Sequence, residues 1–294
     1  MKYRHAYHAG NFADVHKHVT LLALVRALSR KDKGFLLLDT HAGRGLYDLR
    51  AAESQKTSES AGGITLLDTQ SDAELGGATP DEIVDYLQSI RALRKLTHLR
   101  QGYPGSPLLA LQALRVQDRA VFIETQAEEH RALRQALAFC DKAASSECAD
   151  GFARIGAWLP PLERRALILI DPPYEDSAAD FRQLDSAVSE ILRRLPNAVI
   201  AIWYPIKQER DTRLWREKLI ARLPKPADAK QVPTLVSELW VQPRDSRIGL
   251  NGSGMLIINP PWQIEDRMRD WLPWLHQRLD LQRVGGCSVL GEMS

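Results

Sequence analysis

The chain has 294 residues, of which 44% are hydrophobic and 26% are charged, and its formal net charge is +2. This composition is ordinary for a globular protein, and a chain of this length can bury a sizeable core without disulfide staples. The nearly balanced charge excludes a nucleic-acid binder that relies on overall charge, so local patches would have to supply that attraction.

Cysteine usage and hydropathy point to the cytoplasm. The three cysteines, Cys140, Cys148 and Cys287, are scattered and form neither a disulfide framework nor a C-x-x-C zinc site. The N-terminal stretch MKYRHAYHAG lacks the apolar segment of a signal peptide. No apolar run approaches the ~18 residues that a membrane span needs. We therefore expect a cytoplasmic protein with no membrane partner.

The first third of the chain predicts a helix, a buried strand and an insertion. Residues 11–29 have apolar side chains at helical spacing, and Asn11 can cap the helix. The run FLLLDTHAGRG, which starts at Phe35, is typical of a strand buried on both faces that ends in a glycine turn. We assign residues 1–45 to the main domain, 46–101 to a helical insertion and 102–294 to the remainder of the main domain.

The rest of the chain alternates between apolar runs and helical patterns. Strands are expected at 120–125, at the run RALILI and at 198–206, with helices between them, and ADGFARI (149–155) is expected to mark a strand end and loop. The segments LVSELWVQ and GMLIINPPW resemble a closing hairpin pair. This alternation predicts an α/β fold with a mostly parallel sheet that helices cover on both faces.

Polar groups follow four of the predicted strands, in the sequences DTHAG, IET, ADG and DPPY. Ligands of open α/β sheets bind beyond the carboxyl ends of the strands, so these groups could hold one extended cofactor. Glu124 can accept both hydroxyls of a ribose, Asp150 can accept from an adenine amino group, and Gly151 would let the ring approach closely. The alternatives are a plain strand–helix turn, a solvated acid and an ordinary D-G turn.

The sequence Asp171-Pro172-Pro173-Tyr174 is suited to methylation of an exocyclic amine. The lone pair of such an amine is delocalised into the ring, so a site must bind both amine hydrogens and hold the nitrogen against the methyl donor. The Asp171 carboxylate and the Pro172 carbonyl are suitable acceptors, because proline stiffens the backbone. Tyr174 would stack on the base.

A second copy of this pattern, Asn259-Pro260-Pro261-Trp262, follows another apolar run. The tetrapeptide alone therefore does not locate the site. DPPY follows the other polar strand ends in the order expected of parallel strands, whereas NPPW follows an expected antiparallel strand. We place catalysis at Asp171 and interpret NPPW as a structural turn.

The N-terminal stretch MKYRHAYHAGNFADVHKH interleaves basic and aromatic residues. Tyr3, Arg4 and Lys17 suit RNA, through stacking and phosphate contacts. A histidine metal site is the rival interpretation, but no cysteine or dense acid cluster joins these histidines, and we expect no metal. The non-functional alternative is a solvated, basic start of a helix, with Asp14 paired to Lys17 or His18 at helical spacing.

At this point the motifs resemble those of a known family. YRHAYHAGNFADVHKH, LDTHAGRG, YPGSP, ADGF, LILIDPPY, WYP, SGM-IINPPW and LPWL-H occur in order from Tyr3 to about His276. Together they resemble the RlmJ family of 23S ribosomal RNA adenine-N6 methyltransferases. The resemblance implies a Rossmann-like class I methyltransferase domain, with about seven strands and a small helical insertion.

The resemblance also implies a cofactor, a substrate and residue roles. The cofactor is S-adenosyl-L-methionine, and the protein would act as a monomer on protein-free 23S ribosomal RNA. Asp171 would be the catalytic acid–base residue and Tyr3 an RNA contact. Cofactor contacts are implied at His18, His41, Ser106, Glu124, Asp150 and Gly151. Two rivals remain: methylation of DNA adenine or of guanine N2 in RNA, and a non-catalytic RNA-binding assembly factor.

Overall fold

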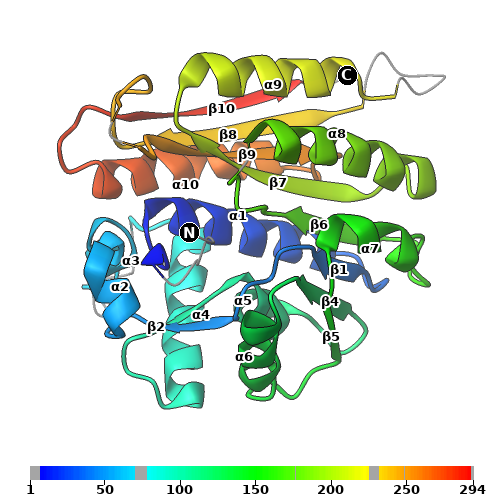
Figure 1. Cartoon of the computed structure of the whole chain (residues 1–294), viewed down its shortest axis with the longest axis horizontal. Helices are drawn as coiled ribbons and strands as arrows, with labels where there is room; N and C mark the ends of the chain where they lie inside the picture. The colour runs from blue at the N-terminus through cyan, green and yellow to red at the C-terminus, as the bar shows by residue number, and fades with distance from the viewer. Residues whose placement is uncertain (1–6, 70–77, 176, 225–231, 248, 293–294) are drawn as a thin grey trace.

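The computed structural model describes residues 7–69, 78–175, 177–224, 232–247 and 249–292. Among these residues, eight strands form one mixed sheet in the order β10-β8-β9-β7-β6-β1-β4-β5, which runs from top to bottom in Figure 1. In chain order these strands are β1 (Leu36–Asp39), β4 (Arg119–Glu124), β5 (Ala144–Cys148), β6 (Ala166–Ile170), β7 (Val199–Ile206), β8 (Thr234–Trp240), β9 (Gly252–Ile258) and β10 (Gly286–Glu292).

The sheet has a parallel half and an antiparallel half. Strands β5, β4, β1, β6 and β7 run parallel, and β9, β8 and β10 continue the sheet with antiparallel pairing. The α/β fold with a mostly parallel sheet is thus confirmed, as is the pairing of β8 with β9. The sheet has one strand more than expected, because β10 pairs with β8 at the edge.

Helices cover both faces of the sheet. One face carries α1 (Phe12–Ser29), α4 (Asp81–Thr97), α5 (Ser106–Ala113), α6 (Ala127–Leu137) and α10 (Ile264–Leu279). The other face carries α7 (Gly151–Trp158), α8 (Ser177–Arg194) and α9 (Glu209–Ala221).

Strand β6 shows how one apolar run fills two cores. Leu167 and Leu169 belong to the core on the α1 side, whereas Ile168 and Ile170 belong to the core on the α8 side. Side chains alternate between the faces of a strand, so a strand with helices on both faces is apolar throughout. The carboxyl end of β6 is thereby held rigidly where the DPPY segment begins.

Helix α1 is buried along most of its length, although it carries histidine, lysine and aspartate side chains. It packs against α5, α4, α10 and the sheet, and it crosses the middle of Figure 1. The Asn11 side chain caps it by accepting a hydrogen bond from Asp14 N, as the sequence predicts. His16 is fully buried and bonds Ser253 and Ser237 through its two ring nitrogens, at 2.9 Å each. These bonds tie α1 to β9 and β8.

The segment expected as an insertion leaves and rejoins the main fold through a short ladder. Strand β2 (Leu46–Asp48) pairs antiparallel with β3 (Gly102–Pro104). Between them lie α2 (Ala52–Thr57), the short 3₁₀ helix η2 (Glu59–Gly62), α3 (Ile64–Leu67) and α4. Helix α4 packs on α1 and α10, so this segment is joined firmly to the main domain. No helix within the described ranges is both long and apolar enough to cross a membrane.

Candidate active site

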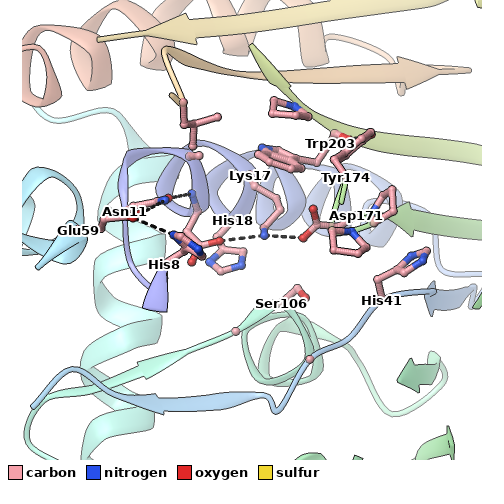
Figure 2. Close-up of a pocket in the computed structure, with 18 of the residues that line it drawn as sticks. His8, Asn11, Lys17, His18, His41, Glu59, Ser106, Asp171, Tyr174 and Trp203 are labelled. Carbon is pink, nitrogen blue, oxygen red and sulfur yellow. Dashed lines mark hydrogen bonds and ion pairs between the residues drawn. The ribbon is translucent and has the colours of Figure 1, made fainter. Parts of the chain in front are cut away.

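Residues from several strand ends line one cavity of about 1090 Å³. The cavity lies beyond the carboxyl ends of β1, β4, β6 and β7, with α1 along its floor in Figure 2. All the predicted site residues in the described ranges line it: Lys17, His18, His41, Ser106, Glu124, Asp150, Gly151, Asp171, Pro172 and Tyr174. Tyr3 and Arg4 lie outside the described residues.

Asp171 follows β6 and forms an ion pair with α1. Its Oδ2 lies 2.6 Å from Lys17 Nζ, which also lies 2.9 Å from Asp14 Oδ1 (Figure 2). Burial alone would lower the pKa of Lys17, but Asp14 and Asp171 together raise it above its ordinary value. Lys17 is therefore a permanent buried cation that orients the Asp171 carboxylate.

This arrangement corrects the expected role of Lys17. The sequence predicts a phosphate contact at Lys17, and such a contact needs an exposed ammonium group. In the structure Lys17 is only 4% exposed, and two carboxylates surround its ammonium group. The alternative of a solvated basic helix start holds only in part. Lys17 does pair with Asp14 at helical spacing, but α1 is buried between the sheet and other helices.

Tyr174 also lies differently from the expected stacking platform. Its backbone has a positive φ of 51°, its side chain is 2% exposed, and its hydroxyl donates to the carbonyl oxygen of Trp203 at 2.5 Å. The ring packs against Phe181 and meets Trp203 edge-on. Tyr174 thus braces the turn, and little of its ring is available for stacking.

Trp203 offers a more accessible ring in the same cavity. It projects from β7, is partly exposed, and lies beside Lys17 and Tyr174 in Figure 2. Its Nε1 donates to Ser253 Oγ at 3.0 Å, which fixes the plane of the indole. The sequence alone predicts no individual role for Trp203. The signal that could have found it is the pair Trp-Tyr before Pro205 at the end of a buried strand.

The β4 end presents a carboxylate that is suited to sugar hydroxyls. Glu124 accepts hydrogen bonds from Gly43 N at 3.0 Å and Gln126 N at 2.7 Å, one on each oxygen. Burial raises the pKa of Glu124, while these two backbone bonds counter that rise. Each carboxylate oxygen has a second lone pair, so Glu124 can still accept from two vicinal hydroxyl groups.

The ADG segment follows β5, as expected, but it begins helix α7 where the sequence predicts a loop. The Asp150 side chain accepts from Phe152 N and Ala153 N as the N-cap of α7. A Cβ on Gly151 would lie 1.9 Å from the Thr40 carbonyl oxygen. Close packing of α7 on the end of β1 therefore accounts for a glycine at this position.

His18, His41 and Ser106 line the cavity with their side chains already bonded. His18 Nδ1 lies 2.8 Å from the Tyr103 hydroxyl, and Ser106 Oγ donates to Asp39 Oδ2 at 2.7 Å. Burial lowers the pKa of His41 to about 4, so its ring is neutral near pH 7. These groups fit a neutral polar ligand or an amino-acid moiety better than a phosphate.

The far end of the cavity joins the insertion to α1. Glu59 accepts from Asn11 Nδ2 at 2.9 Å and pairs with His8 Nδ1 at 2.8 Å (Figure 2). The hydrogen bond to Glu59 raises the pKa of His8, with burial opposing it. The sequence alone predicts no role for Glu59, since its partners lie far away in the sequence.

The described histidines of the N-terminal stretch are not gathered at one point. His8 bonds Glu59, His16 bonds two serines, and His18 bonds Tyr103. Within the part of the chain that the structure describes, no group of three or more His, Cys, Asp or Glu side chains could hold a metal ion.

The second proline motif lies at the opposite end of the strands, away from the cavity. Asn259 follows the antiparallel strand β9, has a positive φ of 55°, and donates through Nδ2 to the carbonyls of Pro196 and Ala198. These bonds close a turn, and none of the four NPPW residues lines the cavity. The interpretation of NPPW as a structural turn fits this geometry.

Comparisons with known proteins agree on one family. A family model described as "Ribosomal RNA large subunit methyltransferase D, RlmJ" matches residues 32–290. Proteins named "Ribosomal RNA large subunit methyltransferase J" from Haemophilus influenzae and Escherichia coli are each 38% identical over 290 residues, 98% of both chains. A solved structure from Legionella pneumophila has a TM-score of 0.83 at 30% identity, covering 96% of this chain and 98% of that one.

Proposed function

This chain belongs to the RlmJ family of ribosomal RNA large subunit methyltransferases, and we propose that it methylates N6 of an adenine in 23S ribosomal RNA. The methyl donor would be S-adenosyl-L-methionine. The observation that carries the proposal is the Asp171 carboxylate, held by Lys17 at 2.6 Å at the end of β6, inside a cavity large enough for a nucleoside beside an extended cofactor.

The residues on the β1, β4 and α7 side would bind the cofactor. Glu124 would accept the ribose hydroxyls beside the turn at Gly43, whose positive φ of 62° suits glycine. His41, Asp150 and Gly151 would contact the adenine ring, and His18 and Ser106 would contact the cofactor nearer Asp171; all five line the cavity. When bound, the cofactor supplies an electrophilic methyl group on a sulfonium centre.

The chemistry on the substrate side belongs to the DPPY segment. Lys17 occupies Oδ2 of Asp171, which leaves Oδ1 to accept one hydrogen of the adenine amine. The Pro172 carbonyl would accept the other hydrogen. Binding both hydrogens directs the nitrogen lone pair out of the ring plane, toward the methyl group. The nitrogen gains a methyl group and loses one proton, which Asp171 or solvent accepts.

The target base would have to leave its stack to enter the cavity. This is cheapest in a loop or at the end of a hairpin. Trp203, which is fixed by Ser253, would provide the ring on which the base lies, with Tyr174 bracing it from behind. Tyr3 and Arg4 remain proposed RNA contacts, and the protein would act as a monomer on protein-free or early-assembly RNA.

Substitution of Asp171 tests this function. We expect Asp171→Asn and Asp171→Ala to lower the methylation rate on protein-free large-subunit RNA by on the order of 10²-fold or more, since both remove the anionic acceptor. Affinity for S-adenosyl-L-homocysteine, measured by calorimetry, should stay near that of the wild type.

The exposed Asp266→Asn, in the first turn of α10, is the matched control and should retain full activity. Near-wild-type methylation by Asp171→Ala would refute the assignment. Loss of cofactor binding together with activity would show a role for Asp171 in the fold rather than in the reaction.

A further inference from the structure

The cavity extends beyond Asp171 to a wall on the antiparallel side of the molecule. Three loops form this wall: Lys207 follows β7, Leu250 precedes β9, and Leu281 follows α10. In Figure 1 strands β7–β9 and α10 lie above α1, whereas the insertion lies below it. The wall therefore faces the cavity from the side opposite the cofactor-binding turns.

The leucine side chains of this wall are more exposed to solvent than is usual for leucines that line a cavity. Leu281 is 70% exposed although it lines a cavity, and Leu250 is partly exposed. Lys207 is exposed, and no ion pair among the described residues engages its ammonium group. An apolar patch with an available cation beside it suits a ligand that combines an apolar face with a negative charge.

A nucleotide next to the target base has this chemistry. An adenine inserted at Asp171 remains joined to its neighbours through phosphates, so the chain must leave the cavity along one of its walls. On the α1 and insertion side, Glu59 pairs with His8 and Asp14 pairs with Lys17, so these two basic side chains already face carboxylates. On the opposite wall Lys207 would attract a phosphate, and the leucines would meet the face of a base or a ribose.

We propose that Lys207, Leu250 and Leu281 bind the nucleotide adjacent to the methylated adenine, Lys207 through its phosphate and the leucines through its base or sugar. This inference rests on the proposed function and assigns a substrate subsite to the same cavity. The contact needs single-stranded RNA, because a base paired within a helix cannot lay its face on the leucines.

The test uses variants that should fold normally, because both altered side chains are exposed. We expect Lys207→Gln combined with Leu281→Ser to raise KM for protein-free large-subunit RNA by roughly tenfold, with kcat at saturating RNA little changed. Lys207→Gln alone should reduce the slope of log affinity against log salt by about 0.7, the contribution of one phosphate contact on a single strand.

Matched controls remove the same groups elsewhere. Lys218→Gln takes away an exposed charge on α9, and Leu162→Ser takes away a leucine that is 90% exposed near the start of β6. If the wall variants match these controls in KM and salt slope while the wild type methylates RNA, the subsite is refuted. A wild type that leaves the RNA unmethylated would overturn the proposed function as well, so the two failures are distinguishable.

Discussion

At the scale of single residues, the geometry of the cavity depends on buried ionisable side chains that are held by ion pairs and hydrogen bonds. Lys17 joins Asp14 to Asp171, and Asp39 lies 1% exposed beneath Ser106 and the His41 backbone. Burial raises the pKa of Asp39 to about 7, with the nearby Asp171 charge adding to the rise and the Ser106 hydrogen bond opposing it. This buried carboxyl group is compatible with the folded state while it is protonated, and its ionisation lowers the stability of the fold.

The pH dependence of stability follows from the Asp39 pKa. Between about pH 4 and pH 7 the folded protein keeps the Asp39 proton that the unfolded chain has lost, so the free energy of unfolding falls as pH rises. Asp39→Asn removes this loss, and its amide can still accept from His41 N and donate to Ser106 Oγ.

We predict that Asp39→Asn stabilises the protein at about pH 8 relative to the wild type, by up to about 4 kcal/mol, and much less at about pH 5. Urea unfolding of both proteins at the two pH values measures the difference. An equal offset at both values would contradict the assigned titration of Asp39.

At the scale of elements, apolar runs made much of the fold predictable. The strands β1, β6 and β7 are apolar throughout because helices cover both of their faces, and each was expected within a few residues of its observed place. The strand ends were expected to meet because parallel strands share one carboxyl edge, and the structure brings Glu124 and Asp171 to one cavity.

Other elements carried no such signal. Strand β5 is the polar sequence ASSEC at a sheet edge, α10 contains Pro273, and β10 begins at a glycine. The sequence predicts the end of β5 only through the ADG segment that follows it, and it predicts neither α10 nor β10. The burial of Lys17 is likewise not evident from the sequence, since its partner Asp171 is 154 positions away and only the fold brings the two together.

The close contact between α7 and the end of β1 predicts an effect on cofactor binding. A methyl group on Gly151 would collide with the Thr40 carbonyl oxygen, so Gly151→Ala must push α7 away from the cofactor-binding turns. We predict a loss of affinity for S-adenosyl-L-homocysteine of roughly tenfold or more, measured by calorimetry, in a protein that remains folded.

Gly156→Ala in the same helix is the matched control, because its added methyl group would meet only the flexible end of Arg194, at 3.3 Å. It should bind the cofactor product like the wild type. Unchanged affinity in Gly151→Ala would show that the end of α7 does not shape the cofactor site.

At the scale of the whole molecule, the two halves of the sheet must stay in register, since the cavity lies across both. A buried polar cluster joins them: Arg216 of α9 pairs with Glu238 of β8, and the Tyr204 hydroxyl of β7 donates to Glu238 at 2.8 Å. Arg244 adds a second contact to Glu238 at 3.4 Å. The wall that we assign to RNA is attached to the parallel half partly through this cluster.

Removing the negative charge of Glu238, at the centre of this cluster, should lower the stability of the whole fold. We predict that Glu238→Gln lowers the free energy of unfolding by about 3 kcal/mol, because it leaves the buried Arg216 without its anion. Urea unfolding measures the change. Glu217→Gln alters an exposed pair with Arg213, at 3.9 Å, and should cost less than about 0.5 kcal/mol. Equal effects of the two substitutions would show that the cluster does not join the halves.

The central claim is that the acceptors of the DPPY segment bind the exocyclic amine of an adenine. The most direct measurement incubates the purified protein with protein-free large-subunit RNA and methyl-labelled S-adenosyl-L-methionine, then digests the RNA and identifies the labelled nucleoside by mass spectrometry. The account predicts label in N6-methyladenosine. Label in N2-methylguanosine, or RNA that carries no label at all, would contradict it.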